Sequence, residues 1–137
     1  MNKIYLKDSL CIDIKAIGFN ELCIKYKKSD GTVFDEEHSD YHEYVRDNGV
    51  TPYSTNSSLD ATEYTIPTLD EALEWLRSKH VYIYAYPINL GNKGSLQFRT
   101  TVITTTSIDN ILNKYFSYEE AINKGIEDAY NYLKPKP

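Results

Sequence analysis

The pattern of hydrophobic and polar residues predicts a helix, a strand, a turn and a second strand between residues 67 and 104. Thr68-Leu69-Asp70-Glu71 is typical of a capping box, in which the Thr and Glu side chains bond to the backbone at the start of a helix. Apolar residues follow at helical spacing, and the period changes to two from Val81 onward. Gly91-Asn92-Lys93-Gly94 then predicts the turn between the two strands.

The predicted helix has one apolar stripe, which we expect to face the core. Its members are Leu69, Ala72, Leu73 and Leu76. Trp75 lies at the edge of this stripe, where packing in the core or at its rim is favoured over stacking on a ligand.

The N-terminal part of the chain predicts a short amphipathic helix. Asp8 or Ser9 is expected to cap it, and Gly18 is expected to end it. Cys11 falls within this helix and Cys23 lies beyond it. In a reducing compartment both are expected to pack as small buried hydrophobes rather than to form a disulfide or a catalytic group.

A β-hairpin is predicted after that helix. Asp30-Gly31 favours a two-residue turn between strands over residues 22–28 and 32–37. In the register that this turn implies, Lys25 faces Glu36, and one face of the hairpin is apolar while the other is charged.

The C-terminal part of the chain predicts a short helix and a longer one. Ser107 is placed to cap a helical segment over residues 108–115, where apolar residues recur at helical spacing. Ser117-Tyr118-Glu119-Glu120 is a second capping box and predicts a final helix that ends at Pro135. Gly125 in its interior costs about 1 kcal/mol relative to Ala, so we expect it to mark a close approach to another element.

These elements predict one α+β domain over residues 1–137, with an antiparallel sheet built from two β-hairpins and about three helices packed on one face. A chain of this length can form a single core. Residues from about 38 to 66 show no sustained period and are expected to form a long irregular connection, which in a compact domain is usually functional or mobile. Residues 134–137 are expected to be a frayed tail.

Composition excludes several classes of protein. The 41% of hydrophobic and 26% of charged residues are typical of a globular chain, whereas 13 tyrosines are an excess that favours half-buried sheet or a contact face. The net charge of −5 disfavours non-specific nucleic-acid binding. Neither a signal peptide nor a membrane span is expected, which favours a cytoplasmic location and no membrane partner.

The strand that begins near Val81 carries the clearest candidate site. Alternation places Tyr82, Tyr84 and Tyr86 on the face opposite the core, and on the next strand Gln97 and Arg99 fall beside them. Aromatic rings beside a guanidinium and an amide are typical of protein contact surfaces and of sites that stack a nucleobase. The alternative interpretation is an ordinary half-exposed sheet face, or one that the long connection or a second subunit covers.

Other motifs do not predict chemistry. His38 and His42 have the spacing of two metal ligands on a helix, but Ser39 stands where a zinc protease needs Glu, so no metal site is expected. The Gly91–Gly94 turn leads into a strand and cannot present a helix N-terminus to phosphate. No serine or cysteine has a partner that would activate it. We therefore expect no catalytic residues, no cofactor and no enzymatic activity.

Three parts of the sequence resemble a group of small uncharacterised proteins encoded by phages and mobile elements of gut bacteria. The matching residues are Ile14–Cys23, then Pro67-Thr68 with Ala72, Trp75-Leu76-Arg77 and Lys79-His80, and finally Ser117–Ala121 with Gly125-Ile126. No activity is established for that group, so the resemblance identifies no functional residues. It implies an accessory protein of a mobile element that works in the cytoplasm of a bacterial host cell.

Two functions of different classes follow as hypotheses. The first is a non-enzymatic protein that binds a host protein, or a second copy of itself, through the tyrosine face and the acidic loop that contains His38 and His42. The second is a binding protein for a nucleotide-type small molecule that sequesters a host defence signal, with Arg99 closing a tyrosine-lined pocket. An uncharacterised structural domain is the further alternative.

Overall fold

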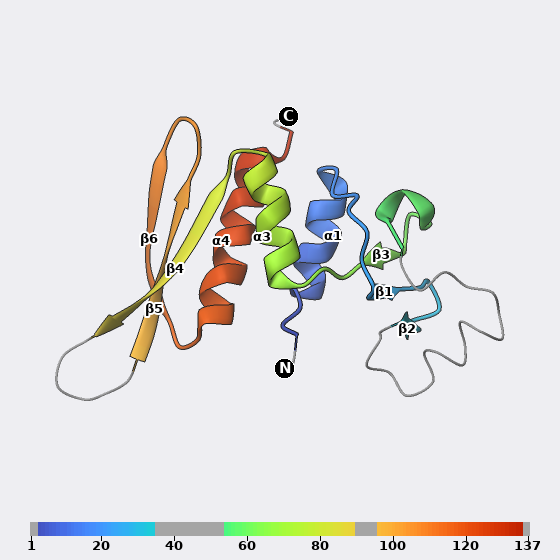
Figure 1. The fold of residues 1–137 in the computed structure, drawn as a ribbon, viewed down its shortest axis with the longest axis horizontal. Helices are drawn as coiled ribbons and strands as arrows, with labels where there is room; N and C mark the ends of the chain where they lie inside the picture. The colour runs from blue at the N-terminus through green and yellow to red at the C-terminus, as the bar shows by residue number, and fades with distance from the viewer. Residues whose placement is uncertain (1–2, 35–53, 90–95, 136–137) are drawn as a thin grey trace. The chain divides into compact units, whose positions relative to one another are not determined.

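A computed structural model of the chain describes residues 3–34, 54–89 and 96–135. These residues form helices and antiparallel sheets, which confirms the α+β class (Figure 1). The chain divides into two compact units. We call Tyr5–Pro67 the N-terminal unit, and Met1–Ile4 with Thr68–Pro137 the C-terminal unit. Whether they fold as one domain stays a prediction.

Helix α1 (Asp8–Ala16) begins the N-terminal unit and buries Leu10, Cys11 and Ile14. The expectation that Asp8 or Ser9 caps it is wrong, because Lys7 occupies the cap position without a side-chain hydrogen bond and Asp8 is already helical. Gly18 ends the helix as expected. Its φ of 104° lies in the left-handed region that favours glycine. Cys23 and Cys11 are both buried, as expected.

Strands β1 (Tyr26–Lys27) and β2 (Val33–Phe34) form the predicted hairpin, but its loop has three residues instead of two. The Gly31 N–H bonds to the Lys28 carbonyl, and Gly31 has a φ of 89°. A hydrogen-bonded turn followed by a left-handed glycine is typical of a three-residue hairpin loop. The register therefore shifts by one residue and pairs Tyr26 with Phe34, whose rings stack 5.0 Å apart. The predicted pairing of Lys25 with Glu36 is wrong in this register, and Glu36 itself lies outside the described residues.

Residues 54–66 are more ordered than the predicted irregular connection. They form the 3-10 helix η1 (Asn56–Ser58) and strand β3 (Tyr64–Thr65), which completes a sheet of order β2-β1-β3. Asn56 is buried, and its side chain donates to the Phe19 carbonyl and accepts from the Thr65 N–H. The sequence of this segment shows no hydrophobic period because hydrogen bonds of polar side chains, rather than an apolar stripe, hold the segment in place. The rest of the predicted connection, through residue 53, lies outside the described residues.

Helix α3 (Leu69–Ser78) opens the C-terminal unit with the predicted capping box. The Glu71 N–H donates to the Thr68 hydroxyl, and the Thr68 N–H donates to the Glu71 carboxylate, at 3.1 and 2.8 Å. The whole predicted stripe is buried. Trp75 and Leu76 are 6% and 1% exposed, which confirms them as core residues.

Strands β4 (Tyr82–Asn89), β5 (Leu96–Ile103) and β6 (Ile108–Tyr115) form an antiparallel sheet in that order. The predicted helix over residues 108–115 is wrong, because this segment is strand β6. Ser107 does not cap a helix there. Its carbonyl accepts from the Thr104 N–H across the tight turn between β5 and β6.

Helix α4 (Tyr118–Leu133) covers the sheet, with α3 on the same side of it (Figure 1). Its cap is Ser117, whose hydroxyl accepts from the Glu120 N–H. Gly125 marks the expected close approach, since a Cβ there would lie 2.4 Å from Ile83 Cγ2. Residues 136–137 of the predicted tail lie outside the described residues.

Candidate functional site

The sheet of the C-terminal unit has one face toward the helices and one open face. Val81 and Ile83 are buried beneath α4 and α3, whereas Tyr82, Tyr84 and Tyr86 are 37%, 54% and 39% exposed. The predicted alternation is therefore confirmed for this strand. The tyrosines point away from the helix-facing core.

Strand register identifies the other members of the open face. Tyr86 pairs with Arg99, and the neighbouring pair joins Ile88 to Gln97, so the sequence correctly brought these residues together. Tyr82 pairs with Ile103, which in turn pairs with Ile108 on β6. We define the open face as these residues together with the neighbouring pair of Thr101 and Asn110. Its members are Tyr82, Tyr84, Tyr86, Ile88, Gln97, Arg99, Thr101, Ile103, Ile108 and Asn110.

Two polar atoms of the open face lack hydrogen bonds among the described residues. The Nε of Arg99 and the Oε1 of Gln97 are both out of contact with solvent and have no such partner. Thr101 differs, since its hydroxyl donates to the Asn110 side chain at 2.9 Å. Buried polar groups normally have a partner, so these two atoms are exceptions among the described residues.

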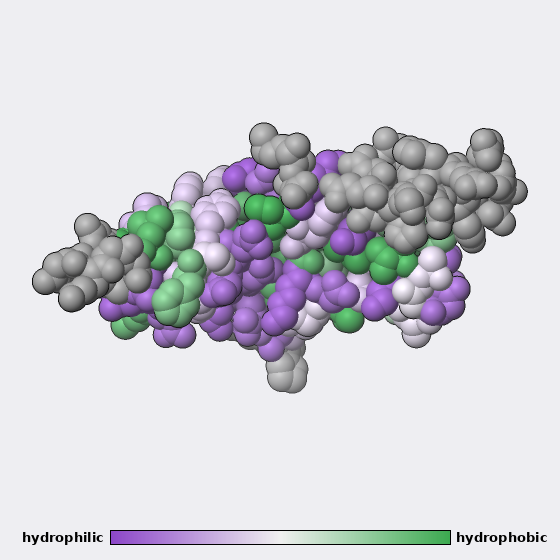
Figure 2. All heavy atoms as spheres, turned by 90° about the horizontal axis from the view of Figure 1, so that it is seen from below, coloured by the Kyte–Doolittle hydropathy of each residue, from purple (hydrophilic) through white to green (hydrophobic). Residues whose placement is uncertain are grey.

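Charge on the open face differs in sign from that of the chain. Arg99 is its one charged residue among the described strands, while the whole sequence has a net charge of −5. Asp109 is the one carboxylate of β4–β6, and its pairing with buried Val102 places it on the helix side. Figure 2 shows hydrophobic side chains at the surface over the sheet and a mostly hydrophilic surface over the neighbouring helices.

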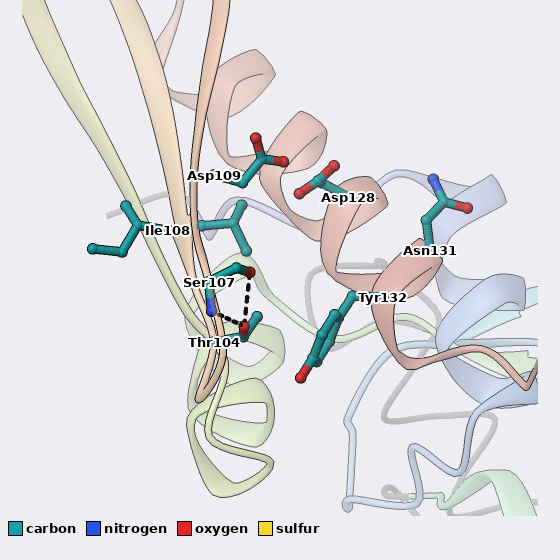
Figure 3. Close-up of a pocket in the computed structure, with 8 residues that line it drawn as sticks. Thr104, Ser107, Ile108, Asp109, Asp128, Asn131 and Tyr132 are labelled. Atoms are coloured by element: carbon teal, nitrogen blue, oxygen red, sulfur yellow. Dashed lines mark hydrogen bonds between the residues drawn. The ribbon is translucent and has the colours of Figure 1, made fainter.

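A pocket of about 430 Å³ lies on the helix side, between β6, the β5–β6 turn and α4 (Figure 3). Its lining combines two apolar residues, two hydroxyls, an amide, a phenol and two carboxyls, from Val102, Thr104, Ser107, Ile108, Asp109, Asp128, Asn131 and Tyr132. Asp109 and Asp128 point toward one another (Figure 3). Loss of solvent around Asp128, its hydrogen bond to Asp109 and the nearby negative charge raise the pKa of Asp128 to about 6.

Sequence reasoning missed this carboxyl pair. Alternation from Ile108 would have placed Asp109 on the helix side, but only if the segment had been assigned as a strand. Asp128 follows Gly125 by three residues and so falls on the same side of α4. The signal available in the sequence was the carboxyl of Asp128, which falls beside the buried apolar stripe of α4.

Other predicted sites gain no support from the described residues. His38, His42 and the Gly91–Gly94 turn lie outside them. Burial raises the pKa of the Cys11 thiol, and its Sγ lies 3.6 Å from the Leu6 carbonyl oxygen. A thiol held in its neutral form is a poor nucleophile. Across residues 3–34, 54–89 and 96–135, no group of three or more potential ligands is placed to hold a metal ion.

Comparison with known proteins yields no relative: no family model, no curated protein and no solved structure matches the chain. The resemblance to mobile-element proteins therefore stays a prediction. None of the helices in the described part of the chain has the length and apolar character needed to cross a membrane.

Proposed function

We propose that this protein is a non-enzymatic binding module whose open face docks on another protein. The observation that carries the proposal is the row of Tyr82, Tyr84 and Tyr86, exposed together on one strand. Ile108, 68% exposed, extends the apolar surface to the far strand. Contiguous apolar surface rimmed by polar groups is typical of protein interaction sites, and tyrosine and arginine are the residues that most often anchor them.

The expected partner presents an apolar surface with a carboxylate or carbonyl group at its edge. Arg99 supplies the positive charge of the open face, and an acidic group on the partner pairs with it. Strands β4 to β6 place no carboxylate on this face, so nothing there opposes an acidic partner. Charge of this kind favours the correct partner and speeds association.

A protein partner is favoured over a nucleotide by the position of the described pocket. That pocket lies on the helix side, away from the tyrosines, and Asp109 and Asp128 both line it. Two carboxyl groups disfavour a phosphate, because like charges repel at short range. Sequestration of a nucleotide-type defence signal is therefore the second candidate, and only the aromatic rings and Arg99 support it.

The resemblance to mobile-element proteins supports a bacterial setting for the partner. A cytoplasmic host protein is therefore the partner we propose. Binding that blocks a host defence factor would fit this setting.

A double substitution tests the proposal. Tyr84→Ser with Arg99→Ser removes the most exposed ring and the charge, while Glu74→Ser with Arg77→Ser makes a matched change at exposed positions of α3. Each tagged protein is used to capture partners from host cells, and the affinity for the captured protein is then measured with purified components. We expect the Tyr84/Arg99 variant to lose at least about tenfold in affinity, equivalent to about 1.4 kcal/mol.

The control and the wild type should bind alike, and all three proteins should melt at similar temperatures. Equal affinity for all three would contradict the proposal, and unfolding of the Tyr84/Arg99 variant would show that the open face is structural. Sedimentation equilibrium of the purified protein tests whether the partner is a second copy of the chain instead of a host protein. A thermal-shift screen tests whether the ligand is a nucleotide, since a ligand at 100 times its Kd adds about 2.7 kcal/mol to the free energy of unfolding.

A further inference from the structure

Strand β6 and helix α4 bring two carboxyl groups together. Asp109 of β6 and Asp128 of α4 line the same pocket. Figure 3 shows the two side chains facing each other from the strand and the helix. Ionised carboxylates repel each other and only accept hydrogen bonds, so a hydrogen bond between these two requires a proton on one of them.

The surroundings of Asp128 offer little compensation for a second negative charge. On α4, Lys124 favours the ionised form and Glu127 opposes it. The Lys124 ammonium also lies 3.6 Å from the Glu127 carboxylate, so its charge is shared. The groups that β5 and the turn bring to the pocket are neutral, and Tyr132 and Asn131 are the further polar residues of α4 in it.

Strand β6 makes few other contacts with helix α4. Helix α4 packs mainly on β4 and β5, and all eight residues of β6 are exposed or half-buried. Among the described strands, β6 pairs with β5 alone. Its ladder is irregular, because Ile111 pairs with Thr100 and Tyr115 pairs with Phe98, so four residues of β6 span two of β5. One polar contact can therefore decide how firmly this strand is held.

We propose that the Asp109–Asp128 pair is a proton-operated latch, which holds β6 against α4 while the two carboxyls share a proton and releases the strand when that proton is lost. The device is independent of what the open face binds. It places a switch on β6, whose Asp109 is the one carboxylate of strands β4–β6.

The direction of the pH dependence follows from the raised pKa of Asp128. Its pKa in the folded protein is about 6, against an ordinary value of 3.8. The folded state therefore keeps a proton that the unfolded state has released, so the stability that the latch contributes is fully present below pH 3.8. It is lost progressively as the pH rises, and is gone once the pH passes about 6.

Asp128→Asn and Asp109→Asn test the latch, because an amide can donate the hydrogen bond at any pH. Melting temperatures from pH 4 to pH 8 are measured for the wild type, both variants and a Glu74→Gln control at an exposed position of α3. Hydrogen exchange of the β6 amides is measured at pH 4.5 and 7.5. We expect the wild type to lose several degrees relative to Asp128→Asn across this range, and its β6 amides to lose at least tenfold in protection at pH 7.5, after correction for intrinsic rates.

The control should follow the wild type, and the Asn variants should keep β6 protected at both pH values. Parallel melting curves for wild type and Asp128→Asn would overturn the proposal, as would equal protection of β6 at both pH values. If the variants fail to fold, the carboxyl carbon of Asp128 is titrated by NMR in the wild type. A midpoint near 4 would then refute the latch, and one near 6 with concurrent shifts in β6 would support it.

Discussion

Gly125 shows how one residue fixes the approach of a helix to a sheet. It lies on the buried side of α4, directly over Ile83 and Thr100. A Cβ at this position would lie 2.4 Å from one side chain and 2.9 Å from the other. Glycine's cost in helix propensity was visible in the sequence, whereas the residues that it approaches were not.

Gly125→Ala should therefore destabilise the protein even though alanine is the better helix former. The gain in propensity is about 1 kcal/mol, and overpacking in a core costs roughly 1–3 kcal/mol. With contacts this short we expect a net loss of about 1–2 kcal/mol in the free energy of unfolding. Urea denaturation measures it, with Glu127→Ala as an exposed control on α4. A gain in stability for Gly125→Ala would show that α4 lies farther from the sheet.

Two leucines make a matched test of burial. Leu76 is 1% exposed in the core, and Leu112 is 76% exposed on β6. Leu76→Ala should cost roughly 2–5 kcal/mol, because it removes buried apolar atoms and leaves a cavity. Leu112→Ala should change stability by less than about 0.5 kcal/mol. Equal effects in chemical denaturation would contradict the assigned faces of α3 and β6.

At the scale of elements, local signals predicted the helices well and strand β6 badly. Capping side chains at Thr68 and Ser117 act within one turn, so sequence alone located both helices. Strand β6 carries apolar residues at helical spacing, but the spacing of four between Ile111 and Tyr115 is produced by its irregular pairing with β5. A bulge of this kind depends on a partner strand, and the segment's own sequence does not reveal it.

The hairpin register depended on a similar detail. Asp30-Gly31 suits a two-residue or a three-residue loop, and the difference moves every side chain of one strand to the other face. Residues 54–66 were also misjudged, because polar contacts hold them. Glu63 is the clearest example. Its carboxylate accepts hydrogen bonds from the N–H groups of Asp60 and Ser29, at 3.0 and 3.1 Å, and lies 3.3 Å from the Lys28 ammonium.

Glu63→Gln should lower the melting temperature at pH 7, because an amide offers one acceptor oxygen in place of two and carries no charge. The hydrogen bonds from Asp60 and Ser29, with the Lys28 ammonium, lower the pKa of Glu63. The stability that it contributes is thus present above the ordinary value of 4.5 and is lost as the pH falls through the lower folded value. Melting curves at pH 7 and pH 3 should differ less for the variant than for the wild type. An equal difference would mean that Glu63 is not held in this way.

At the scale of the whole molecule, the sequence predicted the open face and missed the pocket. The tyrosine row follows from the period of two along β4, and the position of Arg99 follows from a short hairpin between neighbouring strands. The Asp109–Asp128 pair joins residues from two elements, one of which was assigned as the wrong kind of structure. Contacts within a strand or a hairpin could be read from the chain, whereas this contact required the packing of α4 on the sheet.

The central claim, that the open face is the binding surface, is tested most directly by cross-linking in host cells. A photoreactive amino acid is placed at Tyr84 in one protein and at exposed Glu74 of α3 in another. We predict that the probe at position 84 forms a specific cross-link to a single protein, that Arg99→Ser weakens it, and that the probe at position 74 forms none. Cross-linking of that protein from position 74 but not from position 84 would contradict the account.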